Sequence, residues 1–80
     1  MHVAVEMSLY PLTDQFIPPI LDFLDRLKSH ARLVVVTNSM STQVSGEFDA
    51  VFEALRVEIA ATLARNNRAV FVMKVLGGGD

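Results

Sequence analysis

The chain has 80 residues, of which 51% are hydrophobic and 20% are charged, and it contains no cysteine. This length predicts one domain, and the lack of cysteine excludes disulfides and thiolate metal sites. A formal net charge of −2 without a basic run argues against nucleic acid as a partner. No apolar run is long enough to span a membrane, and the first residues lack a signal peptide's basic start, so we expect a cytoplasmic protein.

The apolar content is high for so short a chain. A small domain buries only a limited fraction of its surface, so a monomer would leave much apolar surface in contact with water. We therefore expect the protein to form a homo-oligomer.

The first half of the chain predicts a strand, a helix and a second strand. Apolar residues alternate with other residues over positions 3–10, as in a strand with one apolar face, and Pro11 ends it. Pro18 and Pro19 suit the first turn of a helix, where free N–H groups are not needed. The predicted core stripe of that helix is Ile17, Ile20, Leu21, Leu24 and Leu27. The β-branched run over residues 31–37 predicts the second strand.

The second half predicts a hairpin, a long helix and a final strand. Residues 38–39 would form a turn, and residues 40–44 a weaker strand that pairs with its predecessor. Ser45 or Gly46 is predicted to cap the next helix, whose core stripe would be Phe48, Val51, Phe52, Leu55, Ile59 and Leu63. Asn66-Asn67 predicts the exit turn, residues 69–76 predict the last strand, and residues 77–80 predict a flexible tail.

The order β-α-β-β-α-β predicts one α+β domain over residues 1–76, the ferredoxin-like sandwich. In this fold a four-stranded antiparallel sheet carries two helices on one face, and its other face stays open. The open face is predicted to carry Ala4, Glu6, Ser8, Tyr10, Val70, Val72, Lys74 and Leu76, with Phe71, Met73 and Val75 facing the helices. Such a partly apolar surface is usually covered by another subunit.

Two segments of the sequence resemble the thiamine-binding, YkoF-like family, formerly a domain of unknown function. In VAVEMSLYPL, the acidic Glu6 precedes Pro11-Leu12. In MSTQVSGEFDAVFEAL, the matching residues are Met40-Ser41-Thr42, Gly46-Glu47 and Asp49. Ser41 and Thr13 stand where glycine is common in the family, and glycine reaches backbone conformations that other residues avoid.

The resemblance implies a ferredoxin-like fold that assembles through its sheet faces into homodimers or homotetramers. It also implies non-catalytic binding of thiamine or its hydroxymethylpyrimidine portion, in thiamine or precursor uptake or salvage. The predicted contacts with this small heteroaromatic ligand are Glu6, Ser8, Tyr10, Asn38, Met40, Thr42 and Glu47.

Most of these residues also have an ordinary structural interpretation. Glu6 would accept a hydrogen bond from a ligand amino group, or pair across the sheet with Lys74. Asn38 is typical of a turn, whereas Thr42 is favoured as a ligand contact because it matches a family position. Met40 and Tyr10 would stack on a heteroaromatic ring, or fill the core or a subunit interface.

Glu47 and Asp49 most simply mark the start of a helix, where carboxylates complement the helix dipole. In a binding site they would favour a cation over a phosphate group, and hence unphosphorylated thiamine over its diphosphate.

The sequence gives no indication of an enzyme. No nucleophile stands at a persuasive spacing from a base, no glycine-rich loop precedes a helix, and no catalytic residue is predicted. His2 and His30 lack a second ligand at metal spacing, so no metal and no cofactor other than the possible ligand is expected. The alternative function is a structural or regulatory oligomerisation module that uses the open sheet face and has no thiamine ligand.

Overall fold

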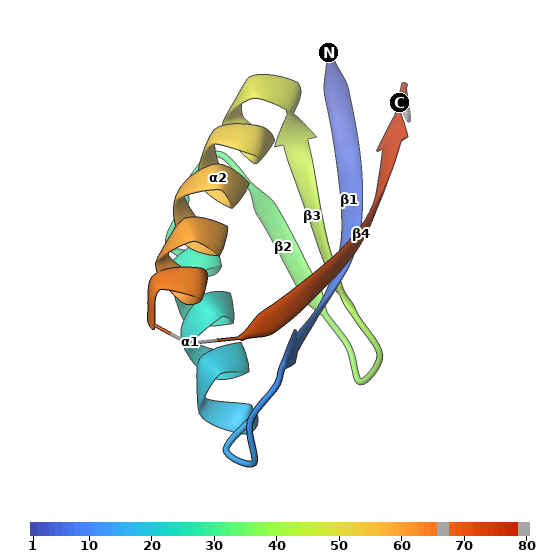
Figure 1. Cartoon of the computed structure of the whole chain (residues 1–80). Helices are drawn as coiled ribbons and strands as arrows, with labels where there is room; N and C mark the ends of the chain where they lie inside the picture. The colour runs from blue at the N-terminus through green and yellow to red at the C-terminus, as the bar shows by residue number, and fades with distance from the viewer. Residues whose placement is uncertain (66–67, 79–80) are drawn as a thin grey trace.

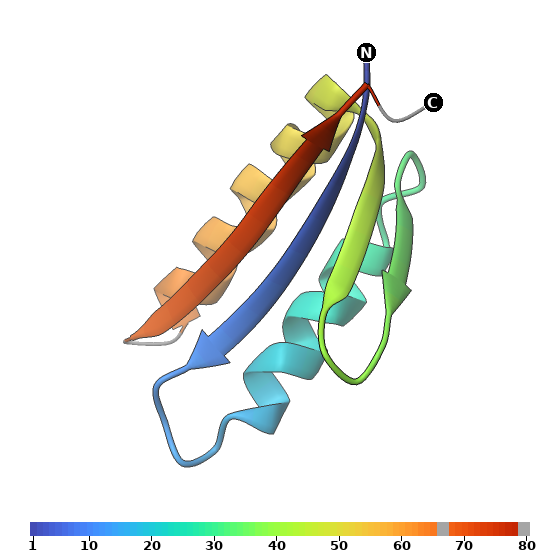
Figure 2. The ribbon, with the colours of Figure 1, turned by 90° about the vertical axis from the view of Figure 1, so that its right-hand side faces the viewer.

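A computed structural model describes residues 1–65 and 68–78 of the chain. Within these residues the elements are β1 (His2–Pro11), α1 (Ile17–Lys28), β2 (Val34–Thr37), β3 (Thr42–Glu47), α2 (Phe48–Arg65) and β4 (Ala69–Gly77). The strands form one antiparallel sheet in the order β2-β3-β1-β4. Both helices lie on one side of the sheet (Figure 1), and no described element covers the other side, which faces the viewer in Figure 2. The predicted ferredoxin-like α+β fold is confirmed.

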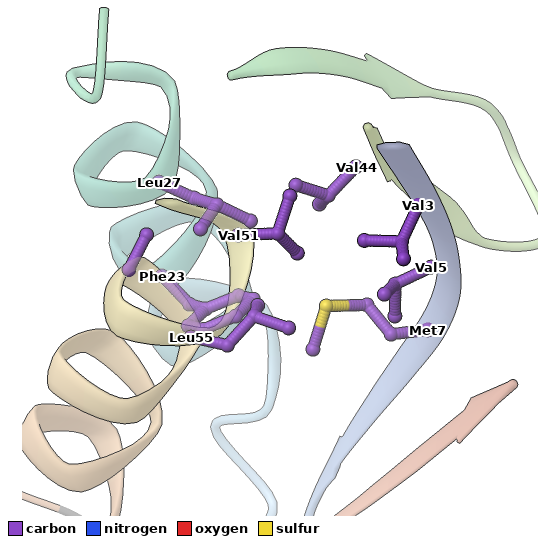
Figure 3. Close-up of a cluster of buried hydrophobic side chains, with 9 residues drawn as sticks. Val3, Val5, Met7, Phe23, Leu27, Val44, Val51 and Leu55 are labelled. Carbon is purple, nitrogen blue, oxygen red and sulfur yellow. The ribbon is translucent and has the colours of Figure 1, made fainter. Parts of the chain in front are cut away.

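The core lies between the helices and one face of the sheet. The alternation in β1 directs Val3, Val5 and Met7 toward the helices, where each is at most 2% exposed. They meet Phe23, Leu27, Val51, Ala54 and Leu55 of the helices and Val44 of β3, most of which Figure 3 labels. Full burial of one such aliphatic or aromatic side chain stabilises the fold by about 1.5–3 kcal/mol.

The buried faces of the helices differ from the predicted stripes. In α1, Phe23 is buried beside Leu27, whereas Ile17 and Leu21 are 51% and 57% exposed. In α2, Val51 and Leu55 are buried as expected. Leu63, by contrast, is exposed, and the polar residues Glu58 and Thr62 are buried with Ala54. A prediction from apolar residues alone misses the buried positions of Glu58 and Thr62. These polar side chains can be buried because Arg26 of α1 forms hydrogen bonds with them.

Several strand boundaries also differ from the prediction. β2 begins only at Val34, and β3 begins at Thr42 but continues to Glu47. The prediction that Ser45 or Gly46 caps the helix is therefore wrong. Both are strand residues that pair with β1. A Cβ atom at Gly46 would lie 3.0 Å from the carbonyl oxygen of Arg32, so glycine permits this close backbone approach.

The remaining boundary differences are at the carboxyl end. β4 ends one residue later than predicted, at Gly77, which pairs with Val3. The predicted exit turn at Asn66-Asn67, and Gly79 and Asp80 of the predicted tail, lie outside the described residues. Neither helix in the described part of the chain is both long enough and apolar enough to cross a bilayer.

Candidate functional site

A shallow groove of about 450 Å³ lies on the open side of the sheet, at the tip of the β2–β3 hairpin. Its walls come from β1, from the hairpin residues 38–41 and from β4. Five of the seven predicted site residues border it: Glu6, Ser8, Tyr10, Asn38 and Met40. Glu6, Ser8 and Tyr10 lie together because they occupy alternate positions of β1, and alternate residues of a strand point to the same face of the sheet.

The hairpin wall is held by hydrogen bonds among its own residues, most of them to the Asn38 side chain. The Asn38 side-chain oxygen accepts hydrogen bonds from the backbone N–H groups of Met40, at 2.7 Å, and Ser41, at 2.9 Å. The Asn38 backbone N–H donates to the Ser41 carbonyl oxygen at 3.0 Å. Asn38 therefore performs the turn chemistry expected of asparagine, and it shapes the groove by fixing the loop.

Glu6 lies on the floor of the groove and is only loosely held. Its neighbour across the sheet is Lys74, whose Nζ atom is 3.8 Å from a carboxylate oxygen. The Ser41 hydroxyl donates a long hydrogen bond of 3.4 Å to the other oxygen. The Glu6 side chain is 46% exposed, so its carboxylate keeps accepting capacity toward the groove.

Two predicted site residues do not border this groove. Thr42 pairs with the buried Met7, faces the helices and is 8% exposed. It lines a separate hollow of about 190 Å³ on the other side of the hairpin, together with Ile20 and Leu24 of α1. The hairpin tip lies between the two spaces, because six residues border both of them: Ser8, Tyr10, Asn38, Ser39, Met40 and Ser41.

Glu47 lies at the far end of β3 from the hairpin. It accepts a hydrogen bond of 2.9 Å from the amino group of Met1, and this bond and charge lower the pKa of the carboxyl. Asp49 lines a different hollow, beside the loop that follows α1. The electrostatic argument for an unphosphorylated ligand, which depended on these two carboxylates, therefore does not apply to the groove.

Five further residues border the groove and were not among the predicted contacts: Ser39, Ser41, Val72, Met73 and Lys74. The alternation of β4 already indicated that Val72 and Lys74 lie on the open face. Their position beside Glu6 and Ser8 follows from the register between β1 and β4, which the alternation alone does not give.

A second polar cluster joins the two helices, and sequence reasoning missed it. Arg26 donates from Nη1 to the Glu58 carboxylate at 2.6 Å and from Nη2 to the Thr62 hydroxyl at 2.6 Å. His30 Nε2 lies 2.7 Å from the other Glu58 oxygen, and Arg26 Nε donates to Asp22 at 3.2 Å. Burial by itself would raise the pKa of Glu58, but the hydrogen bonds from His30 and Arg26 and the Arg26 charge outweigh it and lower that pKa. Both Glu58 oxygens are occupied by these partners, so this cluster fastens the helices together.

Comparison with known proteins places the chain in a family. The sequence matches the YKOF-related family over residues 2–75. The chain belongs to this family. The resemblance drawn from Glu6, Pro11-Leu12 and the Met40–Asp49 segment is thereby confirmed. No curated protein matches the chain significantly.

Solved structures share the fold across nearly the whole chain. A hypothetical protein from Methanocaldococcus jannaschii is 25% identical, with a TM-score of 0.83 over 99% of this chain and 82% of that one. A protein from Thermotoga maritima, described as a proposed thiamine biosynthesis/salvage protein, is 16% identical, with a TM-score of 0.84 over 94% and 82% of the two chains. A domain of unknown function from Bacillus cereus is 14% identical, with a TM-score of 0.73 over 95% and 75%.

Proposed function

We propose that the protein is a non-catalytic binding protein for a small heteroaromatic ligand, thiamine or its hydroxymethylpyrimidine portion. The observation that carries this proposal is the half-exposed Glu6 carboxylate on the floor of a groove with hydroxyl groups, a thioether and an aromatic ring at its edges. Membership of the YKOF-related family and the thiamine-related description of the Thermotoga maritima protein support it. The ligand would serve in thiamine or precursor uptake or salvage.

The chemistry of the groove suits an aminopyrimidine. The Glu6 carboxylate accepts the hydrogen bonds that an exocyclic amino group donates. Tyr10 is 55% exposed and Met40 is 87% exposed, so a flat ring finds a phenol face and a thioether available for stacking. Most small-molecule sites combine apolar walls with a few aimed polar groups, as this groove does.

The second candidate is an assembly module without a thiamine ligand. The open face carries exposed apolar side chains on three strands: Val34 and Val36 of β2, Tyr10 of β1, and Val70, Val72 and Leu76 of β4. Exposed apolar side chains on a sheet face that no described element covers are typical of protein–protein contact. A homodimer or homotetramer formed through this face is compatible with ligand binding and does not require it.

Titration calorimetry with hydroxymethylpyrimidine, and then thiamine, tests the binding proposal. We expect saturable binding to the wild-type protein and a roughly tenfold to hundredfold loss of affinity in Glu6→Gln, because a hydrogen bond to a charged group contributes about 1.5–3 kcal/mol. Glu53→Gln is the matched control, since it removes an exposed carboxylate of α2 and should leave affinity unchanged.

The outcomes separate the two candidates. Absence of heat with either compound, from folded protein, would reject the binding proposal and favour the assembly module. Sedimentation of the same samples tests the module. A monomer at all working concentrations would reject it, and a Val36→Lys variant that dissociates an oligomer would support it.

A further inference from the structure

We propose that the Glu6–Lys74 pair selects the ligand by its charge, favouring a heteroaromatic compound with an anionic substituent, such as a phosphate ester, over a net cation. This inference rests on the proposed function and deepens it. It follows from the placement of one carboxylate and one ammonium group side by side in the groove.

The two charged residues face each other on the neighbouring strands β1 and β4. The β1–β4 register sets Glu6 directly across from Lys74, and their charged atoms are 3.8 Å apart. They are the charged residues among the described residues that line the groove, which otherwise offers hydroxyl, amide and apolar groups. The bare groove is thus close to neutral overall, yet it is strongly polar across a distance of a few ångströms.

Lys74 is free to leave this pair. Its side chain is 84% exposed, and the 3.8 Å contact is longer than a charge-assisted hydrogen bond. Exposed pairs of this kind contribute only about 0.2–1 kcal/mol, so a ligand donor displaces the ammonium from Glu6 at small cost. The displaced ammonium then stays within reach of the bound ligand, because its backbone is fixed in β4.

The consequence depends on the charge of the ligand. A permanent cation such as a thiazolium gains from Glu6 but is repelled by Lys74. A neutral aminopyrimidine pairs with Glu6 and is indifferent to the ammonium. A phosphate ester of that pyrimidine satisfies both residues, the amino group at Glu6 and the phosphate at Lys74, where a lysine acts as a point charge.

The test measures three ligands against three proteins by titration calorimetry at pH 8. The ligands are thiamine, hydroxymethylpyrimidine and hydroxymethylpyrimidine phosphate, and the proteins are wild type, Lys74→Gln and Lys28→Gln. Lys28 ends α1 and does not line the groove, so its variant changes the net charge of the protein equally without touching the site.

In Lys74→Gln we expect the affinities for the two charged ligands to change in opposite directions. Relative to the neutral pyrimidine, which reports the cost of displacing the ammonium from Glu6, affinity for the phosphate ester should fall about twofold to fivefold and affinity for thiamine should rise by a similar factor. Both shifts should shrink in high salt, since exposed charges are screened there. Lys28→Gln should reproduce neither shift.

Two results would overturn the inference. If the neutral pyrimidine binds but Lys74→Gln changes the affinity of all three ligands alike, or of none, the charge-selection role is wrong while the binding function stands. If no ligand binds even the wild-type protein, the proposed function is itself rejected and this inference is rejected with it.

Discussion

Two glutamates of this chain sit in contrasting surroundings. Glu58, between the helices, has a side chain only 11% exposed, and both of its oxygens accept hydrogen bonds, from Arg26 at 2.6 Å and from His30 at 2.7 Å. Glu6, on the open face, is 46% exposed, and its partners lie at 3.4 Å and 3.8 Å. The comparison teaches that a carboxylate in an apolar pattern serves the fold when its acceptors are filled, and is available for binding when they are not.

Removal of the Glu58 side chain should have the largest effect on stability. Glu58→Ala leaves the Arg26 guanidinium, whose side chain is only 18% exposed, without its carboxylate partner on α2. Because Thr62 and Asp22 still contact Arg26, we expect a loss of about 2–3 kcal/mol in the free energy of unfolding. Urea unfolding at one fixed protein concentration measures it, with Glu53→Ala as the exposed control. Equal losses of stability in Glu58→Ala and Glu53→Ala would contradict the inference that the buried hydrogen bonds of Glu58 stabilise the fold.

The pH dependence of stability should show a smaller effect of the same residue. The pKa of Glu58 is lowered in the folded protein relative to its ordinary value of 4.5, so the unfolded chain binds the proton more readily. The stabilisation is fully present above about pH 4.5, and it is lost as the pH falls through the lower folded pKa. The loss is smaller than in Glu58→Ala, because a protonated carboxyl still forms hydrogen bonds.

Comparison with Glu58→Gln isolates this contribution from the other carboxyls whose pKa values are lowered: Asp22, Glu47 and Glu53. Urea midpoints of the two proteins, measured from neutral pH into the acid range, should converge as the pH falls. A gap that stays constant over the whole range would show that the charge of Glu58 contributes nothing to stability.

Glu6→Gln should have the smallest effect on stability. The pair with Lys74 is exposed and long, so its loss should change the free energy of unfolding by less than about 0.5 kcal/mol. The same variant is the one expected to lose ligand affinity. A destabilisation comparable to that of Glu58→Ala would mean that Glu6 serves the fold, and would remove the reason for regarding it as a binding group.

Local patterns were sufficient for the order of elements and for the fold. The alternation of Val3, Val5 and Met7 identified both faces of β1, and the prolines at 18 and 19 located the start of α1. Since β-α-β units have one preferred handedness, the element order then led to a four-stranded antiparallel sheet with both helices on one face. The family resemblance rested on short segments that match residue by residue, and it was confirmed over residues 2–75.

The candidate site was predicted in part, and the misses have physical causes. Glu6, Ser8 and Tyr10 follow from the period of one strand, whereas Thr42 was expected at the ligand and instead faces the helices. β3 begins at Thr42, opposite the buried Met7, and this register fixes the side to which Thr42 points. Glu47 was grouped with the site because Gly46-Glu47 matches the family segment, although strand β3 carries it away from the hairpin.

The sequence by itself determined the order of helices and strands, the class of fold and the presence of a polar hairpin, because the patterns that predict them lie between residues close along the chain. Only the tertiary structure decided which polar groups are satisfied. Glu6 meets Lys74 and Ser41, and Glu58 meets Arg26 and His30, through pairings of residues 28 to 68 positions apart in the numbering. Such distant pairings depend on strand register and helix packing, and these leave no periodic trace in the local sequence.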